Sequence, residues 1–90
     1  MMLEELVTRY IQSAEQVLAE VKVAEEPVRV DERKVKDIVD EAKRYLEDAK
    51  YYRDGERYET SLASVAYCEG LLDALRLLGA VEFALSLIHI

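Results

Sequence analysis

Residues 45–79 read YLEDAKYYRDGERYETSLASVAYCEGLLDALRLLG, and this stretch decides the fold. It predicts the end of one helix, a stop at Gly55, and a second helix that is apolar around most of its circumference. A helix with only a narrow polar strip is not stable alone in water, so other helices, a second copy of the chain or a partner must cover it. The stretch indicates architecture. It contains no catalytic or ligand-binding motif, and the sequence does not say what the protein does.

Two more helices are predicted on the N-terminal side of this stretch. Apolar residues recur with helical three-to-four spacing from Leu3 to Val21 and predict a helix over residues 3–23, after which Pro27 interrupts the chain. Asp31 is a good N-cap for a second helix over residues 31–54. We expect Gly55 to be its left-handed stop.

The third helix is predicted over residues 56–78, with Gly79 as its stop. Its small residues Ala63, Gly70 and Ala74 share one face, where another helix could come close. Glycine costs about 1 kcal/mol relative to alanine inside a helix, and we expect close packing to be the reason that Gly70 is tolerated.

The predicted fold class is all-α, an antiparallel up-down-up three-helix bundle over residues 1–79, because short connections make successive helices antiparallel neighbours. Residues 80–90 form a short apolar tail. A short helix, an extended arm and a disordered end all fit the tail, and its alanine and leucine content slightly favours the helix.

Composition agrees with one helical domain. The chain has 90 residues, half of them apolar and a third charged, with only three glycines and one proline. Side-chain amides are scarce while charges of both signs are dense, which is a thermophile tendency. No run of about 18 apolar residues could span a membrane, and the start lacks a basic, apolar signal sequence, so we expect a cytoplasmic protein without membrane contact.

Three polar residues, Glu69, Asp73 and Arg76, fall on one narrow strip of the third helix. The two carboxylates could hold a cation or anchor a basic partner, although a metal site would need more ligands. We favour a solvent-facing strip with an Asp73–Arg76 pair, or a buried structural network that also includes Asp48.

Tyrosines gather around the turn between the second and third helices: Tyr45, Tyr51, Tyr52, Tyr58 and Tyr67. They could stack on bases or on a flat ligand, but we favour packing at the bundle end with the hydroxyls in water. Basic residues such as Arg53 and Arg57 lie nearby, yet the net charge of −7 repels phosphate backbones and disfavours nucleic acid as a partner.

No constellation points to an enzyme. Cys68 and His89 are each the only residue of their type and lie far apart in sequence, and there is no phosphate loop, paired-cysteine motif or Glu-x-x-His motif. We therefore predict no catalytic, cofactor-binding or metal-binding residue. The residues retained as candidates for interaction or for a polar network are Asp48, Tyr52, Tyr67, Glu69, Asp73 and Arg76.

The second half of the chain resembles a small archaeal family, domain of unknown function 357 (DUF357). The resemblance rests on Tyr45, Asp48-Ala49 and Tyr52, then on residues 61–79, in which Tyr67-x-Glu69-Gly70-Leu71-Leu72-Asp73-Ala74-Leu75-Arg76 is the specific part. Cys68 replaces the usual alanine, and the first helix matches only by its pattern. The resemblance implies a three-helix bundle and no activity, because the family has none assigned.

A looser likeness is to the HEPN group of helical domains, which accompany nucleotidyltransferases. Their ribonuclease members need an arginine followed shortly by a histidine. Here the only histidine, His89, lies thirteen residues after Arg76, so that chemistry is not carried over.

The leading hypothesis is a non-enzymatic protein-interaction or scaffold module, because the third helix and the tail carry more apolar surface than three such helices cover. The alternative is an accessory nucleic-acid- or nucleotide-binding module, HEPN-like but without the ribonuclease motif. The apolar surplus also predicts a homodimer through the third helix and the tail. The competing outcome is a monomer whose tail folds back on its own bundle.

Overall fold

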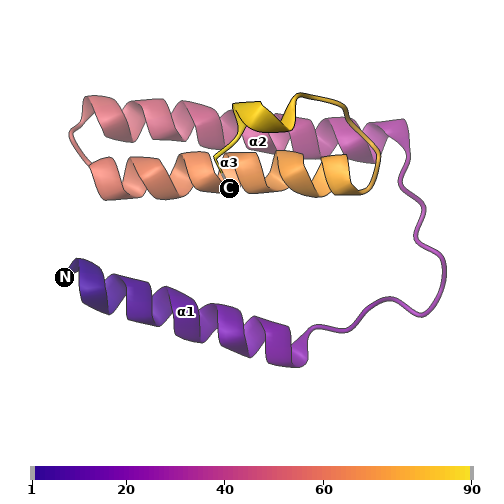
Figure 1. Ribbon diagram of the computed structural model, residues 1–90, viewed down its shortest axis with the longest axis horizontal. Helices are drawn as coiled ribbons and strands as arrows, with labels where there is room; N and C mark the ends of the chain where they lie inside the picture. Colours follow the sequence, from indigo (N-terminus) through magenta and orange to yellow (C-terminus); the bar gives the residue numbers. More distant parts are fainter. Residues whose placement is uncertain (1, 90) are drawn as a thin grey trace.

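The computed structural model describes residues 2–89, which form three α-helices and one short 3-10 helix, with no strand among them. The helices are α1 (Leu3–Glu20), α2 (Glu32–Asp54), α3 (Tyr58–Leu77) and η1 (Leu85–Leu87). Successive α-helices alternate in direction (Figure 1). The all-α class and the three-helix architecture are confirmed. Along residues 2–89, no helix is both long enough and apolar enough to cross a bilayer.

The packed part of the molecule is the hairpin of α2 and α3. Its buried side chains are small on α2, namely Ala42 and Ala49, and are Cys68 and Leu75 on α3. Small residues on one helix let the backbone of the other approach closely, and the Ser61 hydroxyl donates a 2.7 Å hydrogen bond across the hairpin to the Ala49 carbonyl. The hairpin therefore has a tight but small core.

Both ends of α2 are held by local hydrogen bonds. The Lys34 amide donates to the Asp31 carboxylate at 2.9 Å, which confirms Asp31 as the N-cap. At the other end the left-handed residue is Glu56, with φ of 60°, whereas Gly55 has φ of −89°. The prediction that Gly55 is the left-handed stop is therefore wrong by one residue.

The hydrogen bonds at this turn explain the shift. The Glu56 amide donates to the Arg53 carbonyl and the Arg57 amide to the Tyr52 carbonyl, at 3.0 and 2.8 Å. This is the paired arrangement in which the residue after the C-cap is left-handed. Since α2 continues to Asp54, Gly55 occupies the C-cap and Glu56 must adopt the positive φ.

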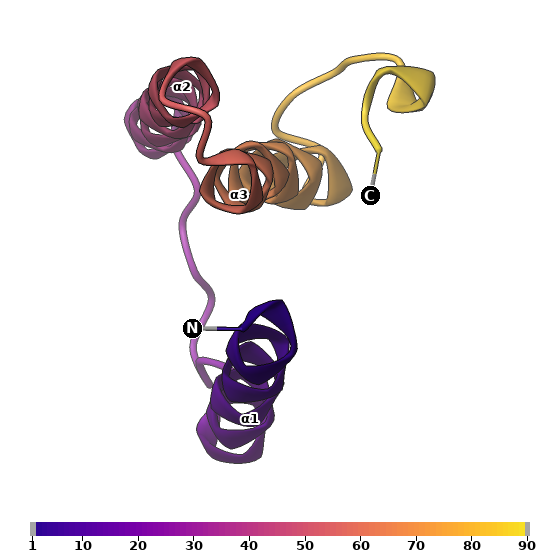
Figure 2. The ribbon, with the colours of Figure 1, turned by 90° about the vertical axis from the view of Figure 1, so that its left-hand side faces the viewer.

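The end of α3 agrees with expectation, because Gly79 has φ of 75° and turns the chain back. The tail then runs along the side of α3 that is opposite α2 (Figure 2). The tail is mostly extended, with the single turn η1. It therefore combines the extended arm with a short piece of helix, two of the three forms that fit the sequence.

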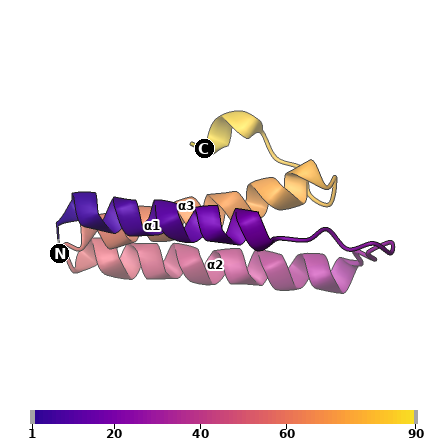
Figure 3. The same ribbon diagram turned by 90° about the horizontal axis from the view of Figure 1, so that it is seen from below.

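Helix α1 lies apart from the hairpin. No Cα atom of α1 comes within 8 Å of one in α2 or α3, and none of its residues is buried. Figure 2 shows it as a separate layer below α3, and in Figure 3 it projects over the hairpin at a different depth. The connection, residues 21–31, is exposed throughout and contains Pro27. Its end is tied to α2, where the Lys34 Nζ donates a 2.9 Å hydrogen bond to the Arg29 carbonyl.

Candidate interaction surface

The polar strip of α3 divides into two separate contacts. Asp73 accepts a hydrogen bond from Arg76 Nε at 2.8 Å, and both side chains are about three-quarters buried. Glu69 instead binds the tail: its Oε2 accepts the His89 backbone amide at 2.7 Å, and its Oε1 lies 3.0 Å from His89 Nδ1. All three strip residues are therefore occupied by contacts within the chain.

The contact with His89 changes the acidity of Glu69. The backbone hydrogen bond, and then the side-chain hydrogen bond and charge of His89, lower the Glu69 pKa, while burial opposes them. The neighbouring Cys68 is free, and burial first and the Glu69 charge second raise its thiol pKa. A raised pKa keeps the thiol protonated and unreactive.

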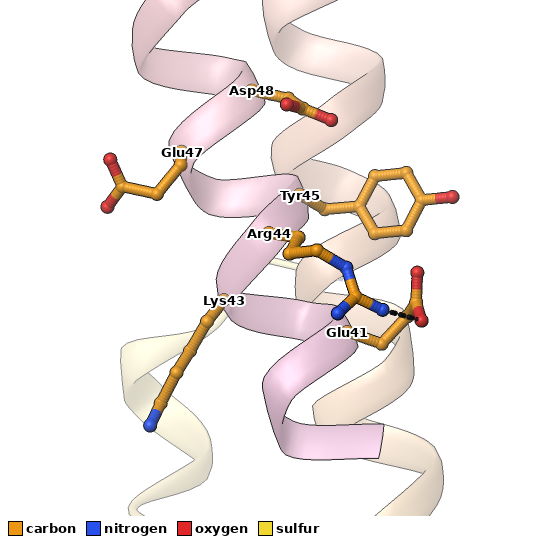
Figure 4. Close-up of a pocket in the computed structure, with 6 residues that line it drawn as sticks. All are labelled: Glu41, Lys43, Arg44, Tyr45, Glu47 and Asp48. Atoms are coloured by element: carbon orange, nitrogen blue, oxygen red, sulfur yellow. Dashed lines mark hydrogen bonds and ion pairs between the residues drawn. The ribbon is translucent and has the colours of Figure 1, made fainter. Parts of the chain in front are cut away.

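Asp48 does not join these residues. It is exposed on α2, and within residues 2–89 its carboxylate makes no hydrogen bond or ion pair. Figure 4 shows Asp48 and Tyr45 pointing to the same side of α2 beside a shallow hollow, where Arg44 pairs with Glu41. A buried network that includes Asp48 is thus not formed.

Four of the five tyrosines form two pairs rather than one cluster, and Tyr58 is exposed and belongs to neither pair. Tyr45 of α2 and Tyr67 of α3 bring their ring centroids to 4.4 Å, tilted by 41°. At the turn, Tyr51 and Tyr52 meet edge to face at 5.5 Å, and the Arg57 guanidinium lies 5.0 Å from the Tyr52 ring centroid.

The Tyr45–Tyr67 pair borders a hollow between the hairpin and α1. Leu6 and Tyr10 of α1 line it on one side, and Ala63 and Tyr67 of α3 on the other. Helical spacing places Gly70, Ala74 and Leu78 on the same face of α3 as Ala63 and Tyr67. We call this face of α3, together with the apolar stripe of α1, the open face.

The α1 part of the open face is exposed along its length. Leu6 is partly buried, and the other large apolar residues of the stripe leave about half or more of their surface in solvent: Leu3, Val7, Tyr10, Ile11, Val17 and Leu18. The sequence predicted that these residues form one helical face but assumed that the bundle covers them. Apart from the backbone of its own helix and its chain neighbours, no heavy atom lies within 4 Å of where a Gly70 Cβ would stand, so close packing does not explain Gly70 in this structure.

Among residues 2–89 there is no group of three or more His, Cys, Asp or Glu side chains arranged to hold a metal ion. Of the candidates from the sequence, Tyr67 alone lies on the open face, Tyr52 lies at the α2–α3 turn, and Asp73 pairs with Arg76.

The family model described as "Protein of unknown function (DUF357)" matches residues 9–81. The match takes in most of α1 as well as the whole hairpin. No curated protein and no solved structure is significantly similar to the chain.

Proposed function

The chain belongs to the DUF357 family, and we propose that it is a non-enzymatic protein-interaction or scaffold module. The observation that carries the proposal is the open face. On the α1 stripe only Leu6 is partly buried among the large apolar residues. Val7 is the next least exposed, and it still has 48% of its surface in solvent. Contiguous apolar surface of this kind marks interaction sites on soluble proteins.

The polar groups support an interaction role over a catalytic one. The acidic groups with the most protected positions, Glu69 and Asp73, are engaged by His89 and Arg76, and the raised pKa of Cys68 makes it a poor nucleophile. We place the module in the cytoplasm.

The test is retention on the immobilised full chain. Ile11→Asp puts a charge in the middle of the α1 stripe, and Glu15→Gln is a matched control on the polar side of the same helix. We expect the wild type and Glu15→Gln to retain the same set of proteins from an extract of the cells that make it, and Ile11→Asp to lose them. Equal retention by all three chains would contradict the proposal.

One observation supports the nucleic-acid alternative. Arg57 lies over the Tyr52 ring, and the neighbouring Tyr51 is 74% exposed, so a base could stack beside a cation at the α2–α3 turn. The net charge of −7 opposes it. We expect no salt-sensitive binding of tRNA or single-stranded DNA at low salt. Binding that is lost in Arg57→Ala would favour the alternative.

A further inference from the structure

The solvent-accessible surface of this chain is larger than that of a compact monomer of the same mass. Its accessible surface is 7817 Å² at 10.3 kDa, whereas a compact monomer of that mass exposes about 5,400 Å². Its radius of gyration is 15.3 Å, against about 12 Å for a compact chain of this length. The surplus arises where α1 lies apart from the hairpin.

We propose that a second copy of this chain covers the open face by exchange of α1, so that α1 of each copy packs on α3 of the other. This inference rests on the proposed function and names the partner. The surplus supports it, because about 2,400 Å² from each of two chains amounts to about 4,800 Å², which lies within the range of obligate homodimers.

The connection between α1 and α2 is suited to the exchange. Residues 21–31 are exposed, and no regular helix forms along them. Eleven residues reach at most about 36–40 Å when extended. The 20 residues of α3 span about 30 Å, so the connection can carry α1 to the hairpin of a neighbouring copy. Exchange of an identical element is a low-cost route to a dimer.

The two halves of the open face also match each other. The α3 half offers small residues, Ala63, Gly70 and Ala74, and the α1 half offers branched ones such as Val7 and Ile11. The one charged side chain that lines the hollow is Glu59, which lies in the first turn of α3 and is exposed, so it can stay in water at the rim of the packed surface. Leu6 and Tyr10, at the start of α1, line the hollow with Ala63, near the start of α3, which sets a parallel register between the two helices.

The tail is not the element that we propose to be exchanged, because in this structure it contacts α3 of its own chain through His89 and Glu69. The proposal therefore differs from a dimer joined through the tail: removal of residues 80–90 leaves the exchange dimer intact.

The first measurement is sedimentation equilibrium of the full chain at micromolar concentration. We expect twice the chain mass for the wild type and for Glu15→Gln, and the single-chain mass of 10.3 kDa for Ile11→Asp. Circular dichroism checks that Ile11→Asp keeps its helices, and Val7→Asp serves as a second stripe variant. A monomeric wild type would overturn the proposal.

The second measurement distinguishes exchange from other dimers. In a Cys68→Ala background, the double variant Ala14→Cys and Gly70→Cys places one thiol on each half of the open face in the parallel register. After oxidation, exchange gives chains linked as a dimer on a denaturing, non-reducing gel. A disulfide within one chain, or none, would overturn the exchange.

These outcomes are separable from those of the proposed function. A monomer with an internal disulfide removes the second copy as partner. The proposal of an interaction module is then tested separately, by whether Ile11→Asp loses proteins that Glu15→Gln retains.

Discussion

At the residue scale, the turn between α2 and α3 places strain on a residue that is not glycine. Glu56 has φ of 60°, a region in which a side chain is disfavoured, while Gly55 beside it has an ordinary φ of −89°. Gly79, at the equivalent point after α3, has φ of 75° and no such strain.

Exchanging residue types at these positions should change stability in opposite directions. We expect Glu56→Gly to raise the free energy of unfolding by about 0.5–1 kcal/mol and Gly79→Ala to lower it by about 1 kcal/mol. Gly55→Ala is the control, since the nearest atom to an added Cβ is 3.6 Å away. Urea unfolding measures all three, and a larger loss in Gly55→Ala than in Gly79→Ala would contradict the turn geometry.

The tail contact should depend on pH through Glu69. Its pKa is lower in the folded state than its unfolded value of about 4.3. The ionised carboxylate therefore stabilises the docked tail fully above that value, and the stabilisation is lost as the pH falls through the folded pKa.

We expect exchange protection of the His89 amide to be present at neutral pH and to be lost in acid, as the pH falls through the lowered pKa of Glu69. Glu69→Ala should remove it at every pH, whereas Asp73→Ala, which breaks the neighbouring Arg76 pair, should leave it in place. Protection that persists in Glu69→Ala would mean that another group holds the tail.

At the scale of the element, α3 carries a glycine that its own hairpin does not require. Gly70 lies inside the helix, and no atom beyond its chain neighbours and its own helical backbone comes within 4 Å of the position of its missing Cβ. In a single chain, Gly70→Ala should therefore stabilise α3 by about 1 kcal/mol.

Thermal unfolding measures this gain in stability from Gly70→Ala, which should appear at protein concentrations low enough to keep the chain monomeric. It should shrink or change sign where two chains associate, because an added methyl group then meets the α1 packed on the open face. An equal gain at all concentrations would show that no helix packs closely at Gly70.

At the scale of the whole molecule, most of the stability available to α1 lies in contacts that the single chain does not make. Exchange of α1 would link folding to association, and the apparent stability of such a protein depends on its concentration.

We expect the midpoint of thermal unfolding to rise with protein concentration for the wild type and for Glu15→Gln. For Ile11→Asp, it should be independent of concentration, because the charged stripe cannot be covered. A midpoint that does not change with wild-type concentration would argue against linked folding and association.

The sequence by itself determined the features that depend on neighbours a few residues apart. The three helices, the Asp31 cap, the Gly79 stop and the Asp73–Arg76 pair follow from spacing within one or two helical turns. Local hydrogen bonds and side-chain periodicity are enough to set them.

Only the tertiary structure decided how distant segments meet. It showed the Glu69–His89 contact across twenty residues, the Tyr45–Tyr67 pair, the one-residue shift of the left-handed turn, and α1 lying apart from the hairpin. The amphipathic stripe of α1 indicates that the helix must be covered but not by what, because apolar burial is non-directional and accepts any complementary surface.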